Sequence, residues 1–177
     1  MPMFSMLFKC PYPGKGEEGI RREITAELAC EILFGESSEL YQKLYEEGLI
    51  DTSFGGGFEV IDGCAMLMLS GDSDDPQAVR QAIIAQAKKL AQEGVAESDY
   101  ARMLRCALGS RIKGLDNFDS TCFRLCAYHL TEFDYFDFPR IYESITREEI
   151  RAFLAENVRQ DNCALSVIYP NAQEETA

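Results

Sequence analysis

The stretch GESSELYQKLYEEGLIDTSFGGGFEV, residues 35–60, decides which fold and which class of function this chain can have. Its serine pair, Ser37 and Ser38, can cap a short amphipathic helix in which Leu40 and Leu44 face inward. Three consecutive glycines follow that helix. They form either a loop that binds phosphate or a strand that lies close to another backbone, and the two alternatives predict different proteins.

The three glycines, Gly55–Gly57, lie in the wrong context for a phosphate loop. Such a loop connects a strand to a helix, so that backbone N–H groups and the helix N-terminus face the anion. Here the strand-like residues 58–63, FEVIDG, come next, and no Lys-Ser or Lys-Thr pair follows. The sequence therefore predicts a bulged strand, or a strand pressed against another backbone.

The elements on either side of this stretch predict an α+β fold. Ile20, Ile24 and Leu28 recur at a spacing of four, which is typical of a helix with one apolar face. Runs of apolar strand formers and further periodic segments complete the pattern. We expect strands at residues 3–10, 50–61, 64–71 and 162–170, and helices at residues 20–34, 38–48, 73–94, 97–113, 117–137 and 146–158. This order indicates a mixed β-sheet with helices packed on one face.

Several short signals fix the ends of these elements. Asp62-Gly63 separates two predicted strands, and this pair favours a type I′ hairpin turn. Asp75 precedes a proline at the expected start of a helix. Thr146 and Glu149 have the spacing of a capping box, so we expect a helix to begin there.

Length and charge restrict the classes of protein. The 177 residues fit one domain, which we place at residues 1–170, followed by a short acidic tail at residues 171–177. The net charge of -13 disfavours nucleic acid and anionic membranes as partners. An acidic face that attracts basic peptides stays open as an alternative.

The cysteines and the N-terminus predict a soluble cytoplasmic protein. Seven cysteines, an odd number, indicate reduced thiols. The N-terminal stretch MPMFSMLFKC has neither the basic start nor the small-residue cleavage site of a signal peptide. The longest apolar runs, such as CAMLML, are far shorter than the ~20 residues of a membrane helix.

One segment could hold a metal. Cys122, Cys126 and His129 are spaced so that two thiols and one imidazole share a helical face. Structural zinc has four ligands, and no second cluster supplies the fourth, so we expect both cysteines to be small core residues and His129 to lie at a boundary. Catalysis by a cysteine and His129 is the remaining enzymatic alternative.

The aromatic segment YHLTEFDYFDFPRIY, residues 128–142, is expected to contribute mainly to the core. A partner-facing patch is the alternative, because so dense a group of aromatic residues is also typical of interfaces.

The order of these elements resembles the pitrilysin/insulinase superfamily, which includes the mitochondrial processing peptidases. The likeness extends from about Phe4 to Pro170, and it is nearest to the zinc-free C-terminal domain of bacterial zinc-peptidase-like proteins. Its signatures are AELACEILFGESSELYQKLYEEGLI at residues 26–50, GCAMLMLSGDSDDPQAVRQAI at 63–83, VAESDYARMLRCALGSRI at 95–112 and LCAYHLTEFDYFDFPRIYESITREEIRAFLAENV at 125–158.

The resemblance implies two homologous α+β halves that close on each other like a clamshell. The catalytic half carries the zinc motif H-x-x-E-H, and the other half completes the substrate chamber. This chain has one histidine, so we expect no cofactor here and zinc in the partner half. In active relatives an arginine and a tyrosine near the short helix help to hold the substrate. The matching positions are Tyr45 and Asp51, our candidate substrate-binding residues, whose side chains differ from those of the family.

Three functions are consistent with these patterns. The leading one is a non-catalytic half that pairs with a zinc-bearing half, in cis or in trans, and acts on a peptide or protein substrate as part of a zinc metalloendopeptidase. The alternative is a peptidase-derived binding or scaffold module with no proteolytic role. The third is an independent enzyme that uses the cysteine and histidine group. A missing partner would also leave an apolar face exposed and promote self-association.

Overall fold

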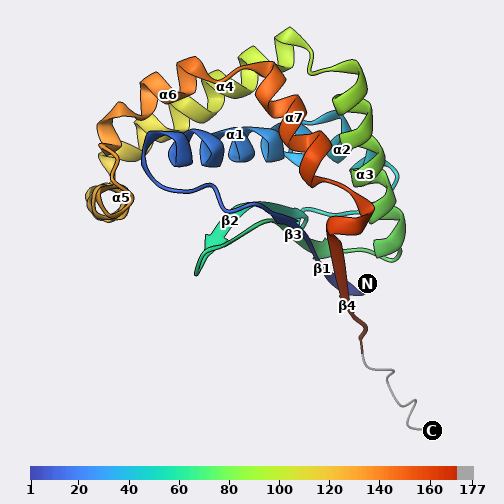
Figure 1. Cartoon of the computed structure of the whole chain (residues 1–177). Coiled ribbons are helices and arrows are strands. Elements are labelled where there is room, and N and C mark those ends of the chain that lie inside the picture. The colour runs from blue at the N-terminus through green and yellow to red at the C-terminus, as the bar shows by residue number, and fades with distance from the viewer. Residues whose placement is uncertain (171–177) are drawn as a thin grey trace, which may run out of the picture.

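The computed structural model of the chain describes residues 1–170 and contains one four-stranded sheet (Figure 1). Its strands are β1 (Met3–Cys10), β2 (Gly55–Ile61), β3 (Cys64–Asp72) and β4 (Cys163–Ile168). They lie in the order β2-β3-β1-β4. The predicted α+β class is confirmed. In place of the mixed pairing that the sequence suggested, all three pairings are antiparallel.

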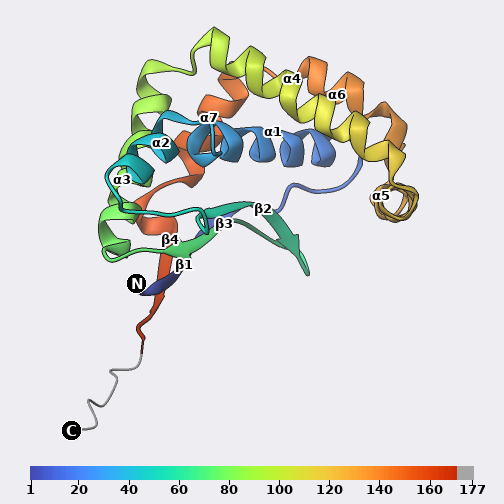
Figure 2. The ribbon, with the colours of Figure 1, turned by 180° about the vertical axis from the view of Figure 1, so that it is seen from behind.

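The helices lie on one face of this sheet, as both views show (Figures 1 and 2). Their bounds are α1 (Gly16–Phe34), α2 (Glu39–Glu46), α3 (Pro76–Glu93), α4 (Glu97–Lys113), α5 (Phe118–Leu130), α6 (Phe138–Ser144) and α7 (Arg147–Asn157). None of the helices formed within residues 1–170 combines the length and apolar character that crossing a bilayer requires.

The core lies between the sheet and helix α1. Phe4, Met6 and Phe8 alternate along β1 and are buried against the helices, which is the period-2 pattern of a strand with one covered face. Ile24 and Leu28 of α1 are also fully buried. The stripe of apolar residues in α1 therefore covers the same face of the sheet that β1 presents.

The predicted caps and the hairpin turn are confirmed. The Oγ of Ser38 accepts a hydrogen bond from the backbone N of Tyr41 at 3.1 Å. Thr146 and its capping-box partner form both expected bonds at the start of α7. Asp62 and Gly63 have φ angles of 49° and 78°, as a type I′ turn requires.

The single helix expected at residues 117–137 is wrong. Helix α5 ends at Leu130, and Glu132 then adopts a left-handed φ of 64° that no α-helix contains. A new helix, α6, begins at Phe138, with Pro139 in its first turn. Proline favours this position because the first N–H groups of a helix have no internal acceptor. The acidic tail predicted at residues 171–177 lies outside the described residues.

A charged network ties the outer helices to α1. The guanidinium of Arg111, whose side chain is 8% exposed, donates to a Glu27 carboxylate oxygen at 3.0 Å. It also donates to the hydroxyl of Tyr128 at 2.9 Å and lies 6.0 Å from the ring centre of Tyr142. One buried cation from α4 therefore joins groups from α1, α5 and α6.

We predict that Arg111→Met lowers the free energy of unfolding by about 2 kcal/mol, because it leaves the Glu27 carboxylate and the hydroxyls of Tyr128 and Tyr142, which accept from Arg111 at 2.9 and 3.4 Å, without their donor. Urea unfolding followed by circular dichroism measures the loss. Arg140→Met is the matched control, since it removes an exposed guanidinium that binds Glu17 in a two-bond pair. Equal effects of the two substitutions would contradict the prediction.

Glu23 on α1 makes stability depend on pH. Its burial raises the pKa of the carboxyl above its usual range, and the nearby charge of Glu27 raises it further, while Arg111 lowers it. A carboxyl with a raised pKa in the folded state binds its proton more tightly there than in the unfolded chain. Its ionisation therefore costs stability as the pH rises from the unfolded pKa, about 4.3, through the folded one.

We predict that Glu23→Gln raises the urea midpoint at pH 7 and that this gain disappears below the unfolded pKa of glutamate. Unfolding curves of both proteins from pH 4 to pH 8 measure the difference. A gain that does not change with pH would show that the charge of Glu23 is not its cause.

Candidate functional site

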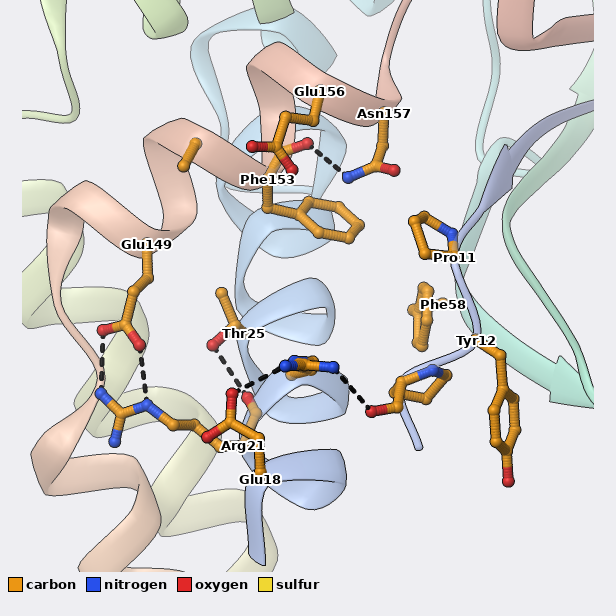
Figure 3. A pocket seen from close by; sticks show the side chains of 13 residues that line it. Pro11, Tyr12, Glu18, Arg21, Thr25, Phe58, Glu149, Phe153, Glu156 and Asn157 are labelled. Carbon is orange, nitrogen blue, oxygen red and sulfur yellow. Dashed lines mark hydrogen bonds and ion pairs between the residues drawn. The ribbon is translucent and has the colours of Figure 1, made fainter. Parts of the chain in front are cut away.

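A cavity of about 390 Å³ lies between helices α1 and α7, the segment that follows β1, and strand β2 (Figure 3). Its lining residues are Pro11, Tyr12, Pro13, Glu18, Arg21, Arg22, Thr25, Phe58, Glu149, Ala152, Phe153, Glu156 and Asn157. Of these, the sequence patterns gave a role only to Glu149, and only as a helix cap.

The apolar wall of the cavity comes from two aromatic rings. Phe58 of β2 and Phe153 of α7 meet edge to face, with ring centres 6.1 Å apart and planes at 81°. Asn157 lies beside them, 4% exposed, and donates from Nδ2 to the backbone oxygen of Phe153 at 2.8 Å. The rings hold the helix layer against the edge strand of the sheet, so the wall is part of the packed core.

The opposite wall is held by an ion pair between two helices. Arg21 of α1 donates two hydrogen bonds to the carboxylate of Glu149 on α7, at 2.7 and 2.9 Å. The same carboxylate accepts from the backbone N of Thr146 at 2.8 Å as part of the capping box. These donors, the Arg21 guanidinium first, hold the pKa of Glu149 below its usual range.

The lining of the cavity carries more negative than positive charge. Arg22 donates to Glu18 at 3.1 Å and to the backbone oxygen of Pro13 at 3.5 Å. Within residues 1–170 no cation pairs with the carboxylate of Glu156. The lining therefore holds three carboxylates and two guanidinium groups, and the carboxylate without a counterion is that of Glu156, next to Asn157 (Figure 3).

We predict that Glu149→Ala lowers the free energy of unfolding by about 1–2 kcal/mol, because it removes a helix cap and a partly exposed two-bond ion pair together. Thermal unfolding measures the loss. Glu148→Ala is the matched control at the preceding position, where the carboxylate only binds the exposed Arg151. A control that loses as much stability as Glu149→Ala would contradict the assigned roles.

The candidate substrate residues Tyr45 and Asp51 lie away from this cavity, and each makes local contacts. The ring of Tyr45 is half-exposed on α2 and stacks on Tyr41, with centres 6.1 Å apart. The Oδ1 of Asp51 accepts from the backbone N and the hydroxyl of Ser53, at 2.8 and 2.5 Å. These bonds lower the pKa of Asp51 and shape the turn before β2.

The sulfur and imidazole candidates share α5, as their spacing predicted. Cys122 is partly exposed, whereas Cys126 and His129 are exposed, so the expected core role of the cysteines is wrong. Among the residues that the structure describes, no three histidine, cysteine or acidic side chains are grouped so that they could hold a metal ion.

The three glycines lie in β2, which continues in regular register with β3 as far as Ile61 and Cys64. No bulge interrupts the pairing. A Cβ at Gly56 would stand 2.0 Å from the backbone oxygen of Met68, so this glycine permits a close backbone approach. The predicted close packing is confirmed, and no helix follows the glycines to complete a phosphate site.

The comparisons with known proteins agree on one family. Residues 2–105 match the family described as the peptidase M16 inactive domain. Over 158 residues the chain is 26% identical to the uncharacterized zinc protease YmfH of Bacillus subtilis, covering 89% of this chain and 36% of the relative. The chain thus spans little more than a third of this relative.

Solved structures show the same fold. An M16-like peptidase from Alicyclobacillus acidocaldarius matches with a TM-score of 0.87 at 22% identity, over 96% of this chain and 41% of that chain. The inactive peptidase domain of a zinc protease from Bordetella parapertussis matches with a TM-score of 0.81 at 14% identity, over 100% of this chain and 95% of that chain.

Proposed function

This chain belongs to the M16 peptidase family, as an M16 inactive domain, and on that premise we propose that it completes the substrate chamber of a zinc metalloendopeptidase. The catalytic zinc is bound by a homologous companion half, in cis or in trans. The observation that carries this proposal is the match to the inactive domain together with the length of the relatives. The Bacillus subtilis relative and the Alicyclobacillus acidocaldarius structure extend well beyond the region that matches this chain.

An exposed apolar surface supports a companion. Four large apolar residues in and just after α5, which we together call the α5 surface, are exposed: Phe118, Phe123, Leu130 and Phe136, at 78%, 74%, 74% and 56%. Helix α5 stands at one end of the helical layer in both views (Figures 1 and 2). Large exposed aromatic groups mark protein interfaces, so the α5 surface is where we place contact with the companion.

The aromatic segment of residues 128–142 divides between the two predicted roles. Tyr135 and Tyr142 are buried in the core, as expected. Leu130 and Phe136 belong to the α5 surface and match the partner-facing alternative. This division supports a role for the segment in the chain's own packing, and we propose that its exposed residues contact the companion.

The alternative is a binding or scaffold module that kept the fold and lost proteolysis. The bonds of Asp51 favour it, because this carboxylate is already engaged by Ser53 and shapes a turn. Under the leading proposal, Tyr45 and Asp51 face the substrate despite their changed chemistry. Cleavage by the assembled protein separates the two functions.

We also propose that the chain works in the cytoplasm as one domain, residues 1–170, with residues 171–177 as a tail. All seven cysteines lie within the described residues, and each is a free thiol. Free thiols in this number suit a reducing compartment. The negative net charge supports a peptide or protein partner over nucleic acid or an anionic membrane.

We predict that this chain alone leaves a fluorogenic peptide library intact and that cleavage begins when a zinc-bearing companion half with H-x-x-E-H is added. The physical reason is that the metal activates water while this chain supplies the second wall. The rate of fluorescence increase at equal concentrations of the two halves is the measurement. A companion whose motif glutamate is replaced by glutamine is the control.

Variants of this chain sharpen the same assay. Phe118→Ser with Phe123→Ser should abolish the gain in cleavage, whereas Lys88→Ser, an exposed change on another helix, should leave it intact. Tyr45→Ala and Asp51→Asn then show whether those positions affect KM. Cleavage by the isolated chain would refute the proposal, and a mixture that forms a complex without cleaving would favour the scaffold alternative.

A further inference from the structure

Two acceptor groups in the lining of the cavity between α1 and α7 receive no hydrogen bond from a described residue, and both can be reached by a ligand. Asn157 is 4% exposed as a whole residue and its Nδ2 donates to the backbone of Phe153, while its Oδ1 is open to solvent. The Glu156 carboxylate beside it has no cation among residues 1–170. Two neighbouring acceptors of this kind suit a ligand that brings both positive charge and N–H groups.

The position of Glu156 within α7 strengthens this argument. The residue lies in the last turn of the helix, where the carbonyl groups create a partial negative charge and the turn contains no basic residue. A carboxylate there is unfavourable for the helix itself. A bound cation would offset both the helix dipole and the excess negative charge of the cavity.

The walls of the cavity suit the stem of a long side chain. Phe58 and Phe153 present apolar ring surface below the two acceptors, and Pro11 closes the opposite side (Figure 3). Lysine and arginine carry methylene stems that pack on such surfaces while the charged head reaches a polar group. An arginine head can also stack on an aromatic ring.

We propose that this cavity binds the lysine or arginine side chain of a peptide, with the charged head at Glu156 and Asn157 and the stem against Phe58 and Phe153. The net charge of -13 assists by attracting basic peptides to the chain. The inference deepens the proposed function, because it names peptides with basic side chains as the substrate class that this half would bind. Only the identification of such a peptide as a peptidase substrate rests on the proposed function.

Binding is tested on the isolated chain, so the result does not depend on a companion half or on cleavage. The ¹⁵N-labelled protein is titrated with acetyl-Gly-Gly-Arg-Gly-Gly-amide and its lysine analogue, and amide shifts are followed by NMR. Citrulline replaces arginine and norleucine replaces lysine in two control peptides, which keep the methylene stem but carry no charge. We expect the basic peptides to shift the amides of Phe58, Phe153 and Asn157, and the neutral ones to bind about tenfold more weakly.

A pair of variants with equal charge isolates the site. Glu156→Gln should weaken binding of the arginine peptide about tenfold, whereas Glu143→Gln, an exposed change on α6, should leave the Kd unchanged. Both substitutions are at exposed positions and remove one negative charge. Equal losses of affinity from the two variants would show only a general charge attraction and would overturn the site. Amide shifts that the basic peptides cause only outside the cavity would overturn it as well.

The outcomes also separate this inference from the proposed function. Binding of basic peptides to the isolated chain, without cleavage in the presence of a companion, would support the cavity and refute the peptidase role. Cleavage by the mixture with no binding at the cavity would support the peptidase role and refute this site.

Discussion

The fold depends on one helix, α1, which covers the single buried face of the sheet. A four-stranded antiparallel sheet with one apolar face needs a matching apolar layer, and α1 supplies it with Ile24 and Leu28. Helix α1 also contacts most of the other helices. Glu27 binds Arg111 of α4, and Arg21 binds Glu149 of α7. The same helix therefore anchors the core, the helical layer and one wall of the cavity.

The sequence predicted those parts of the structure that local chemistry determines. Asp62-Gly63 specified the hairpin, Ser38 specified a helix start, and Thr146 with Glu149 formed the expected box. Local signals failed at α5, because the left-handed turn at Glu132 lies within residues 117–138, a run that contains no glycine or proline to mark the end of a helix. The mixed sheet was also expected in error, since strand direction depends on how the chain returns across the sheet.

The cavity could not be predicted, because its residues come from α1, α7, β2 and the segment after β1. Phe58 and Phe153 are 95 positions apart in the sequence yet meet edge to face. Each looks like an ordinary core residue by itself. Glu156 was equally hidden among 30 acidic residues, and only the fold shows that it lacks a cation and stands beside a buried amide. Tyr45 and Asp51, by contrast, were candidates because a family pattern suggested them, and the structure shows only local contacts for both.

Hydrogen–deuterium exchange of this chain, measured with and without a zinc-bearing M16 half, tests the central claim most directly. A companion that completes a chamber must bury the α5 surface, so exchange should slow at residues 118–136 when the halves are mixed at equal concentrations. The rest of the outer helical layer should exchange as before. Unchanged exchange throughout the chain, with the companion present in excess, would contradict the claim that this domain is one half of a peptidase.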